Sequence, residues 1–258
     1  MKEKEYTFED IIDEEKQLVI DAPIKYGEFW GNSYGFVIFM NRFIKSIDDI
    51  DKFLFLTFLS QVKKHLTLAL FSTVRRHHVQ ANMDMRQVLE ASSWAAYVMA
   101  FREENKFYEN DTSGNLCVPK VLKEKRNKWL NENYQIKSDE IKRNITLINE
   151  STAHSNIAYA FNNFKMRPTD NPGFELQFFD HEDEYVIKTN LWSIANITMG
   201  LIDLFIGVNQ THKVFKLADD FKDSYRQLIE LNNKLKSEMM AHKRYAESLK
   251  INSVITKD

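Results

Sequence analysis

Hydrophobic positions recur at helical spacing along most of this chain. Between Met83 and Phe101 they cover nearly the whole circumference of a helix, which is typical of a helix buried on all sides. Only 7 Gly and 4 Pro interrupt the pattern, which favours long helices over a many-turned β fold. We therefore predict a mainly all-α fold, a helical bundle packed around the segment 83–101. The predicted helices of the bundle are 33–46, 51–74, 83–101, 138–165 (with Ser138 as N-cap) and 189–208.

One short region departs from the helical period. Apolar and polar residues alternate from Phe174 to Phe178, and a short apolar run follows at 185–187. Alternation with period two is the signal of a half-buried strand. The pattern predicts one small β-hairpin near 174–188, inside a bundle domain that spans residues 1–208.

Apolar residues near the C-terminus recur every seven positions. Repeats of this length predict a helix of the coiled-coil type over 210–250, in a C-terminal unit of residues 209–258. Such a helix either pairs with a second copy of the chain or lies across its own bundle, and we expect the first, a homodimer. The repeated positions are Val214, Phe221, Leu228, Leu235, His242 and Leu249.

Composition excludes several classes of protein. The 258 residues carry a formal net charge of -2, which argues against non-specific coating of nucleic acid. A single cysteine, Cys117, excludes an internal disulfide, and the charged start of the chain does not resemble a signal peptide, so we expect a cytoplasmic protein. Asp203 interrupts the apolar run at 189–208, and we expect no membrane span. Neither a glycine-rich phosphate loop nor a zinc-ligand spacing is present, so we expect no cofactor and no metal.

Two ionisable residues lie within the apolar segment 83–101. Arg86 and Glu90 are four residues apart, so they share a helix face and can pair. His154 lies on the apolar face of the predicted helix 138–165. The three side chains form either a buried structural polar core or a polar pocket of the kind that helical bundles use as sites.

Basic residues gather in two places. Arg75 and Arg76 follow the predicted helix 51–74, where they either cap its C-terminus or contact phosphate. A second run follows Pro119 on another predicted helix, where it forms either a solvated face or an RNA contact. The candidate nucleic-acid contacts are Arg75, Arg76, Lys120, Lys123, Arg126 and Lys128.

The segments Arg86–Ala91 and Ile148–Ser155 resemble those of HEPN-type helical proteins of prokaryotes. The first has Arg-x-x-x-Glu inside an apolar helix, and the second has a histidine near its middle. The resemblance implies a helical bundle, frequent dimerisation and association with RNA cleavage or with defence and toxin systems. Ribonuclease members carry an Arg four to six residues before the His, whereas the nearest upstream Arg of this chain is Arg143.

Two functions are consistent with these features of the sequence. The first is a dimeric interaction or regulatory protein with a protein or RNA partner, in which Arg86, Glu90 and His154 form a structural polar core. The alternative is a metal-independent ribonuclease with His154 as general acid or base, Glu90 as its orienting partner and Arg86 as the stabiliser of phosphate charge.

Overall fold

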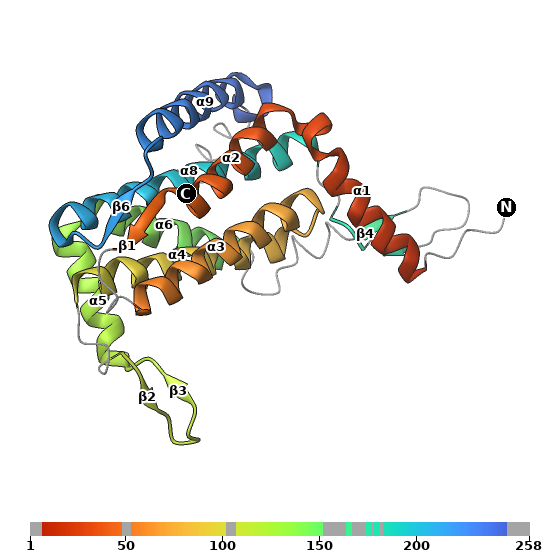
Figure 1. The fold of residues 1–258 in the computed structure, drawn as a ribbon. Helices are drawn as coiled ribbons and strands as arrows, with labels where there is room; N and C mark the ends of the chain where they lie inside the picture. Colours follow the sequence, from red (N-terminus) through yellow and green to blue (C-terminus); the bar gives the residue numbers. More distant parts are fainter. Residues whose placement is uncertain are drawn as a thin grey trace, which may run out of the picture.

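The fold is mainly all-α, as predicted. A computed structural model describes residues 7–47, 53–101, 107–151, 164–166, 174–176, 178–180 and 183–246. Its long helices lie side by side in a bundle, and short two-stranded pairings occur at the edges (Figure 1). His154 lies outside the described residues.

The helices α3 (Phe53–Val74) and α4 (His78–Ala100) form an antiparallel pair and pack along their length. Arg76, in the turn between them, has φ 60°, a left-handed conformation that lets the chain reverse within three residues. Most of α4 is buried, as the sequence predicts for this segment. Asp84 of α4 binds His65 of α3, with 2.7 Å between Oδ1 and Nδ1, so a partly buried polar contact joins the two helices here.

The helix α8 (Glu184–His212) contacts α3, α4, α6 and α9 as well as α2 (Glu28–Arg42). The C-terminal part of α8 is held by aromatic stacking, with 6.4 Å between the ring centroids of Phe205 and Phe43. Asp203, which interrupts its apolar run, accepts a hydrogen bond from the Tyr225 hydroxyl at 2.6 Å. Burial and this carboxylate both raise the pKa of Tyr225, so the phenol stays protonated and continues to donate.

Among the described residues, α8 is the one helix long and apolar enough to cross a membrane. Its most apolar window of 18 residues has a mean hydropathy of 1.7, and half of that window is buried inside the protein. A core helix of a soluble protein has the same properties, so this finding is weak evidence for a membrane span.

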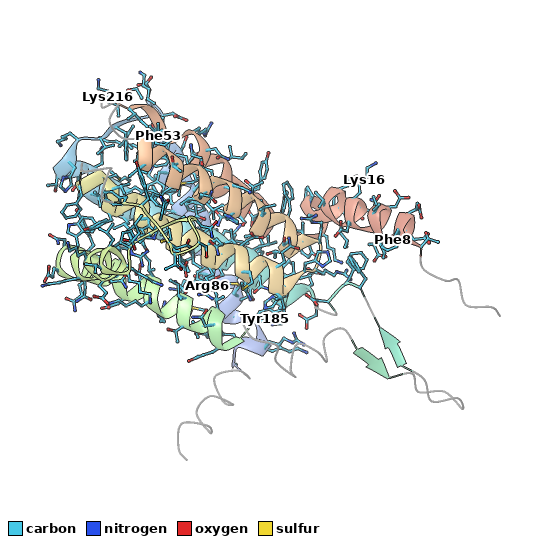
Figure 2. All side chains as sticks on the ribbon, turned by 90° about the horizontal axis from the view of Figure 1, so that it is seen from below. Phe8, Lys16, Phe53, Arg86, Tyr185 and Lys216 are labelled. Carbon is cyan, nitrogen blue, oxygen red and sulfur yellow. The ribbon has the colours of Figure 1, made fainter. Side chains whose placement is uncertain are left out.

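The first helix, α1 (Phe8–Tyr26), begins at a capping box. The Thr7 hydroxyl accepts from the Asp10 backbone N–H at 3.2 Å, and the Asp10 carboxylate accepts from the Thr7 backbone N–H at 3.0 Å. The N-terminal half of α1, which carries Phe8 and Lys16, extends beyond the ends of α3 and α4 (Figures 1 and 2). Phe8 is accordingly 82% exposed.

The helices α5 (Lys120–Asn133) and α6 (Gln135–Ser151) follow one another with Tyr134 between them. The short pairing of β2 (Glu109–Asn110) with β3 (Leu116–Cys117) precedes α5. The predicted N-cap at Ser138 is wrong, because the Ser138 backbone N–H already donates to the Tyr134 carbonyl inside α6. The predicted helix over 138–165 also ends too late, since residues 164–166 form a strand.

A small hairpin is present, but its second strand is not the predicted one. β5 (Phe174–Leu176) pairs antiparallel with β4 (Phe164–Met166), which precedes it in the chain. The apolar run at 185–187 instead forms the first turn of α8, because the Asp183 carboxylate accepts from the Val186 backbone N–H at 3.1 Å and caps the helix. The hairpin prediction near 174–188 is therefore correct for the first strand and wrong for the second.

The predicted continuous helix over 210–250 is also wrong. α8 ends at His212, β6 (Phe215–Leu217) follows, and α9 begins only at Phe221 and ends at Ala241. β6 pairs antiparallel with β1 (Ile44–Ile47). At ~1.5 Å per residue the 21 residues of α9 span about 31 Å, a length that the bundle itself can cover.

The apolar face of α9 packs on its own bundle, the second of the two arrangements considered for this helix. Leu235 is 0% exposed, and the ring of Phe221 packs at a tilt against Phe39 of α2, with 5.2 Å between ring centroids. A buried amide contact fixes the register, because Asn32 Nδ2 of α2 donates to Asn232 Oδ1 of α9 at 2.9 Å. The heptad positions Phe221 and Leu235 are thus used inside the chain, while dimerisation itself stays a prediction.

Candidate functional site: a polar cavity between three helices

Arg86 and Glu90 pair as predicted, but the pair is not buried. Arg86 Nε lies 3.2 Å from Glu90 Oε1, and the two side chains are 32% and 36% exposed. Pairs of this kind contribute only about 0.3–0.5 kcal/mol to stability. Because His154 lies outside the described residues, its approach to Glu90 stays a prediction.

Arg126 does not face solvent, so its prediction as a nucleic-acid contact is wrong. Its guanidinium lies 4.3 Å from the ring centroid of Trp94 on α4, and the residue is 6% exposed. Burial lowers the pKa of Arg126 to about 10, although the nearby carboxylate of Glu90 opposes the shift. Arg126 therefore joins α5 to α4 through a cation–π contact.

The other basic candidates divide into two groups. Arg75 Nε donates to the Phe71 carbonyl at 3.2 Å, and this contact supports the capping interpretation for the end of α3. The Arg76 carbonyl accepts from the Asp180 backbone N–H at 3.0 Å. Lys120, Lys123 and Lys128 are exposed on α5, where their role as RNA contacts stays a prediction.

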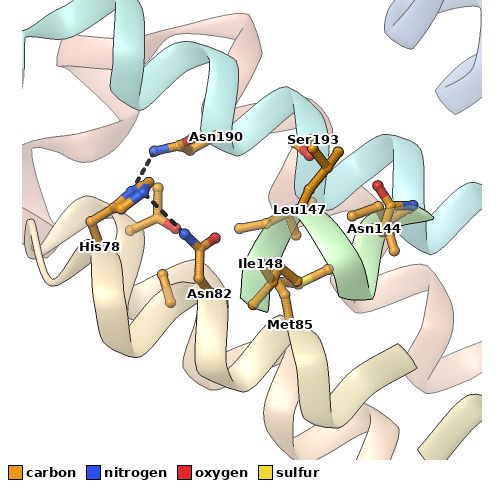
Figure 3. Close-up of a pocket in the computed structure, with 12 residues that line it drawn as sticks. His78, Asn82, Met85, Asn144, Leu147, Ile148, Asn190 and Ser193 are labelled. Atoms are coloured by element: carbon orange, nitrogen blue, oxygen red, sulfur yellow. Dashed lines mark hydrogen bonds between the residues drawn. The ribbon is translucent and has the colours of Figure 1, made fainter. Parts of the chain in front are cut away.

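A cavity of about 240 Å³ lies between α4, α6 and α8 (Figure 3). We call it the first cavity. Apolar side chains form much of its wall, and carboxamides, hydroxyls and one imidazole interrupt them, the usual make-up of a ligand site. The lining residues are Thr73, His78, Ala81, Asn82, Met85, Asn144, Leu147, Ile148, Asn190, Ser193, Ile194 and Ile197.

His78 is held at one end of the first cavity. Its backbone N–H donates to Asp180 Oδ2 at 2.6 Å, at the start of α4. Its ring nitrogens Nε2 and Nδ1 lie 3.0 Å and 3.1 Å from the side-chain amides of Asn82 and Asn190 (Figure 3). A carboxamide from each of two helices therefore fixes the plane of the ring.

The imidazole of His78 is neutral at pH 7. Burial lowers its pKa, and the negative charge of Asp180 only partly opposes this shift. A neutral imidazole has one acceptor nitrogen and one N–H. The structure places Nδ2 of both carboxamides on the ring nitrogens, so the imidazole accepts from one of them, and the other amide must turn its oxygen toward the ring N–H to pair with it.

A second cavity, also about 240 Å³, adjoins the first along α6 and α8. Asn144, Ser193 and Ile197 line both. The second cavity also contains charged groups from α6, and Lys137 Nζ lies 3.3 Å from Glu140 Oε2. The residues that line only the second cavity are Leu89, Lys137, Glu140, Ile141, Arg143, Trp192, Asn196, Met199, Gly200 and Leu201.

Small residues on a helix face allow close helix packing or leave room for a ligand, and α8 has several of them. Both occur. A Cβ added at Gly207 would lie 3.4 Å from the Tyr134 ring, so the helices approach closely there. Ser193 and Gly200 instead line the cavities.

The patterns in the sequence did not single out His78, Asn82 or Asn190. A signal exists in the spacing, since His78, Asn82 and Met85 are four and three residues apart and share one face of α4. Asn190 and Ser193 share a face of α8 in the same way. The sequence does not show that these two faces line one cavity together with α6, because this depends on the tertiary fold.

Comparisons with models of protein families, with curated proteins and with solved structures found no match for this chain. Within the described parts of the chain, no group of three or more His, Cys, Asp or Glu side chains could hold a metal ion.

Proposed function

We propose that the protein is a HEPN-like interaction or regulatory protein whose binding site is the pair of adjoining cavities between α4, α6 and α8. The observation that carries the proposal is the contrast between these cavities and the charged groups. Carboxamides, hydroxyls and an imidazole line open space, whereas Glu90 pairs with Arg86 on its own helix and Arg126 packs on Trp94. The resemblance to HEPN-type proteins adds a dimeric state and a place in prokaryotic defence or toxin systems as further parts of the proposal.

RNA cleavage separates this proposal from the ribonuclease alternative. Purified wild type, His154→Ala and the control His242→Ala are incubated with RNA in the presence of EDTA, after circular dichroism has shown that all three are folded. We expect no cleavage above the buffer blank by any of them. Cleavage by wild type and by His242→Ala, lost in folded His154→Ala, would contradict the proposal and establish the ribonuclease.

The dimer is tested separately, by light scattering on the full chain over a range of concentrations. The expected mass is twice the chain mass of 30.5 kDa. A monomer at every concentration would remove dimerisation from the proposal and leave the binding site unaffected.

A further inference from the structure

We propose that a third cavity, of about 200 Å³ between α2, α8 and the end of α9, binds a small organic cation of the substituted ammonium class. This inference goes beyond the proposed function, because the third cavity shares no lining residue with the first and second cavities. Three features support it: an aromatic wall, an ammonium group that the protein itself places there, and a carboxylate without a counter-charge.

The wall of the third cavity is largely aromatic. Phe29 of α2 and Met239 of α9 line it and are 4% and 8% exposed. The rings of Tyr185 and His242 also line it and stack on each other, with 4.4 Å between their centroids. The face of an aromatic ring attracts cations, and a thioether adds a polarisable apolar contact. Such a wall suits both the charge and the alkyl groups of a substituted ammonium ion.

The protein already places one ammonium group at this cavity. Lys188 Nζ lies 5.6 Å from the centroid of the Phe29 ring and 2.7 Å from Glu184 Oε1. A position between an aromatic face and a carboxylate is favourable for an organic cation. Because the Lys188 side chain is itself part of the wall, the volume of about 200 Å³ stays open beside it.

The charges around the third cavity leave one carboxylate over. Lys188 pairs with Glu184, whereas Glu238 has no ion-pair partner among the described residues. Glu238 also lies in the last turn of α9, where the helix dipole favours positive charge. The N-terminus of α8, which favours anions, is capped by the carboxylate of Asp183. An additional cation therefore balances the charge of the site, whereas an anion would meet two carboxylates.

The size and exposure of the third cavity define the ligand further. Its volume is below the ~300–1,000 Å³ of common pockets for drug-sized molecules, so the group that enters is small. Glu238 and His242 are exposed, so the cavity can be reached from solvent. A trimethylammonium head group combines a small size, a positive charge and an apolar surface.

Titration of the full chain with choline at pH 8 and low salt tests the inference, and methyl NMR follows it. We expect a saturable shift of the Met239 methyl group and little change at Met240, which does not line the cavity and is 48% exposed. The neutral analogue 3,3-dimethyl-1-butanol has the shape of choline without its charge and should bind at least ~5-fold more weakly.

Three variants test the roles of the charged residues. Glu238→Gln should weaken choline binding about 3- to 5-fold, because it removes the unpaired carboxylate at an exposed position. The matched control Glu230→Gln, which is exposed on the same helix and does not line the cavity, should bind choline as wild type does. Lys188→Met removes the resident ammonium and should tighten binding by a similar factor.

Four results would overturn the inference. The first is a Met239 shift that sodium chloride reproduces at the same concentration, and the second is equal binding of choline and its neutral analogue. The third is an affinity of Glu238→Gln equal to that of Glu230→Gln. The fourth is weaker choline binding by folded Lys188→Met, because the account assigns Lys188 the role of a competing cation.

Discussion

The helix α8 is packed in two different ways on its two sides. Toward α2 and α9 its neighbours interlock: a Cβ added at Gly35 of α2 would lie only 2.7 Å from Leu228 Cδ2 of α9, and the buried amides of Asn32 and Asn232 meet. Among the described residues, a cavity of about 200 Å³, the third cavity, occurs on this side only near the start of α8, beside Phe29 and Met239. Toward α6 the same helix borders two cavities along its length, lined in part by amides and hydroxyls. We call these the interlocked side and the cavity side of α8.

The difference shows how one bundle can combine stability with a site. Close-packed apolar side chains contribute burial and dispersion, and they leave no room for a ligand. Polar side chains that line open space contribute little to stability and keep hydrogen-bonding groups available. The interlocked side therefore holds the fold, and the cavity side is available for function.

The largest expected effect is on the interlocked side. Leu235→Ala removes a side chain that is 0% exposed and should lower the free energy of unfolding by about 2–5 kcal/mol. Urea denaturation measures it, with exposed Lys236→Ala as the control that stays within about 0.5 kcal/mol of wild type. A decrease in the free energy of unfolding no larger than that of the control would mean that α9 does not pack on the bundle.

A smaller effect concerns the amide contact. Asn232→Leu leaves Asn32 Nδ2 buried without its acceptor and should cost about 1–3 kcal/mol, whereas exposed Asn233→Leu should cost little. The double variant Asn32→Leu with Asn232→Leu should cost less than the sum of the two single variants, because neither amide of this pair is left buried without the other. Additive costs in this cycle would show that the two amides do not interact.

The smallest effect is on the cavity side and depends on pH. Burial lowers the pKa of His78 from its ordinary 6.5, so the unfolded chain binds a proton more readily than the folded one. Its contribution to stability is therefore complete above pH 6.5 and is lost as pH falls from there through the lower pKa of the folded protein. For one group the slope cannot exceed about 1.4 kcal/mol per pH unit.

Urea denaturation of wild type and His78→Gln between pH 5 and 8 isolates this contribution. The variant should show a shallower fall in stability below pH 6.5. A fall as steep as that of wild type would contradict a buried, neutral His78, since the remaining histidines are common to both proteins.

The helical period predicted the bundle well and failed where a local side chain redirects the backbone. Val214 and Phe221 are seven residues apart and both are buried, so the seven-residue pattern of apolar residues continues across the end of one helix and the start of the next. Asn209 makes that break, because its Oδ1 accepts from the backbone N–H groups of Val214 and Phe215. Lys213 is left-handed there, with φ 50°, a conformation that the pattern of apolar residues does not encode.

The candidate site was only partly predictable for a related reason. The spacing of Arg86 and Glu90 gave their pairing, but their exposure depends on how far α5 and α6 cover α4. Arg126 looked like one more residue of a basic run, and its stacking on Trp94 required the placement of α5. The residues that line the first cavity come mainly from three helices that are far apart in the sequence. The sequence alone therefore does not show that these residues meet.

Methyl NMR during titration with a panel of small neutral polar molecules tests most directly whether the cavity side is the binding site. Labelled isoleucine and methionine methyl groups report on the first cavity through Met85, Ile148, Ile194 and Ile197, and on the interlocked side through Met40. The account predicts saturable shift changes at the first group and none at the second. Shift changes at Met40 instead, or no change at any methyl group, would contradict the assignment of the binding site to the cavity side.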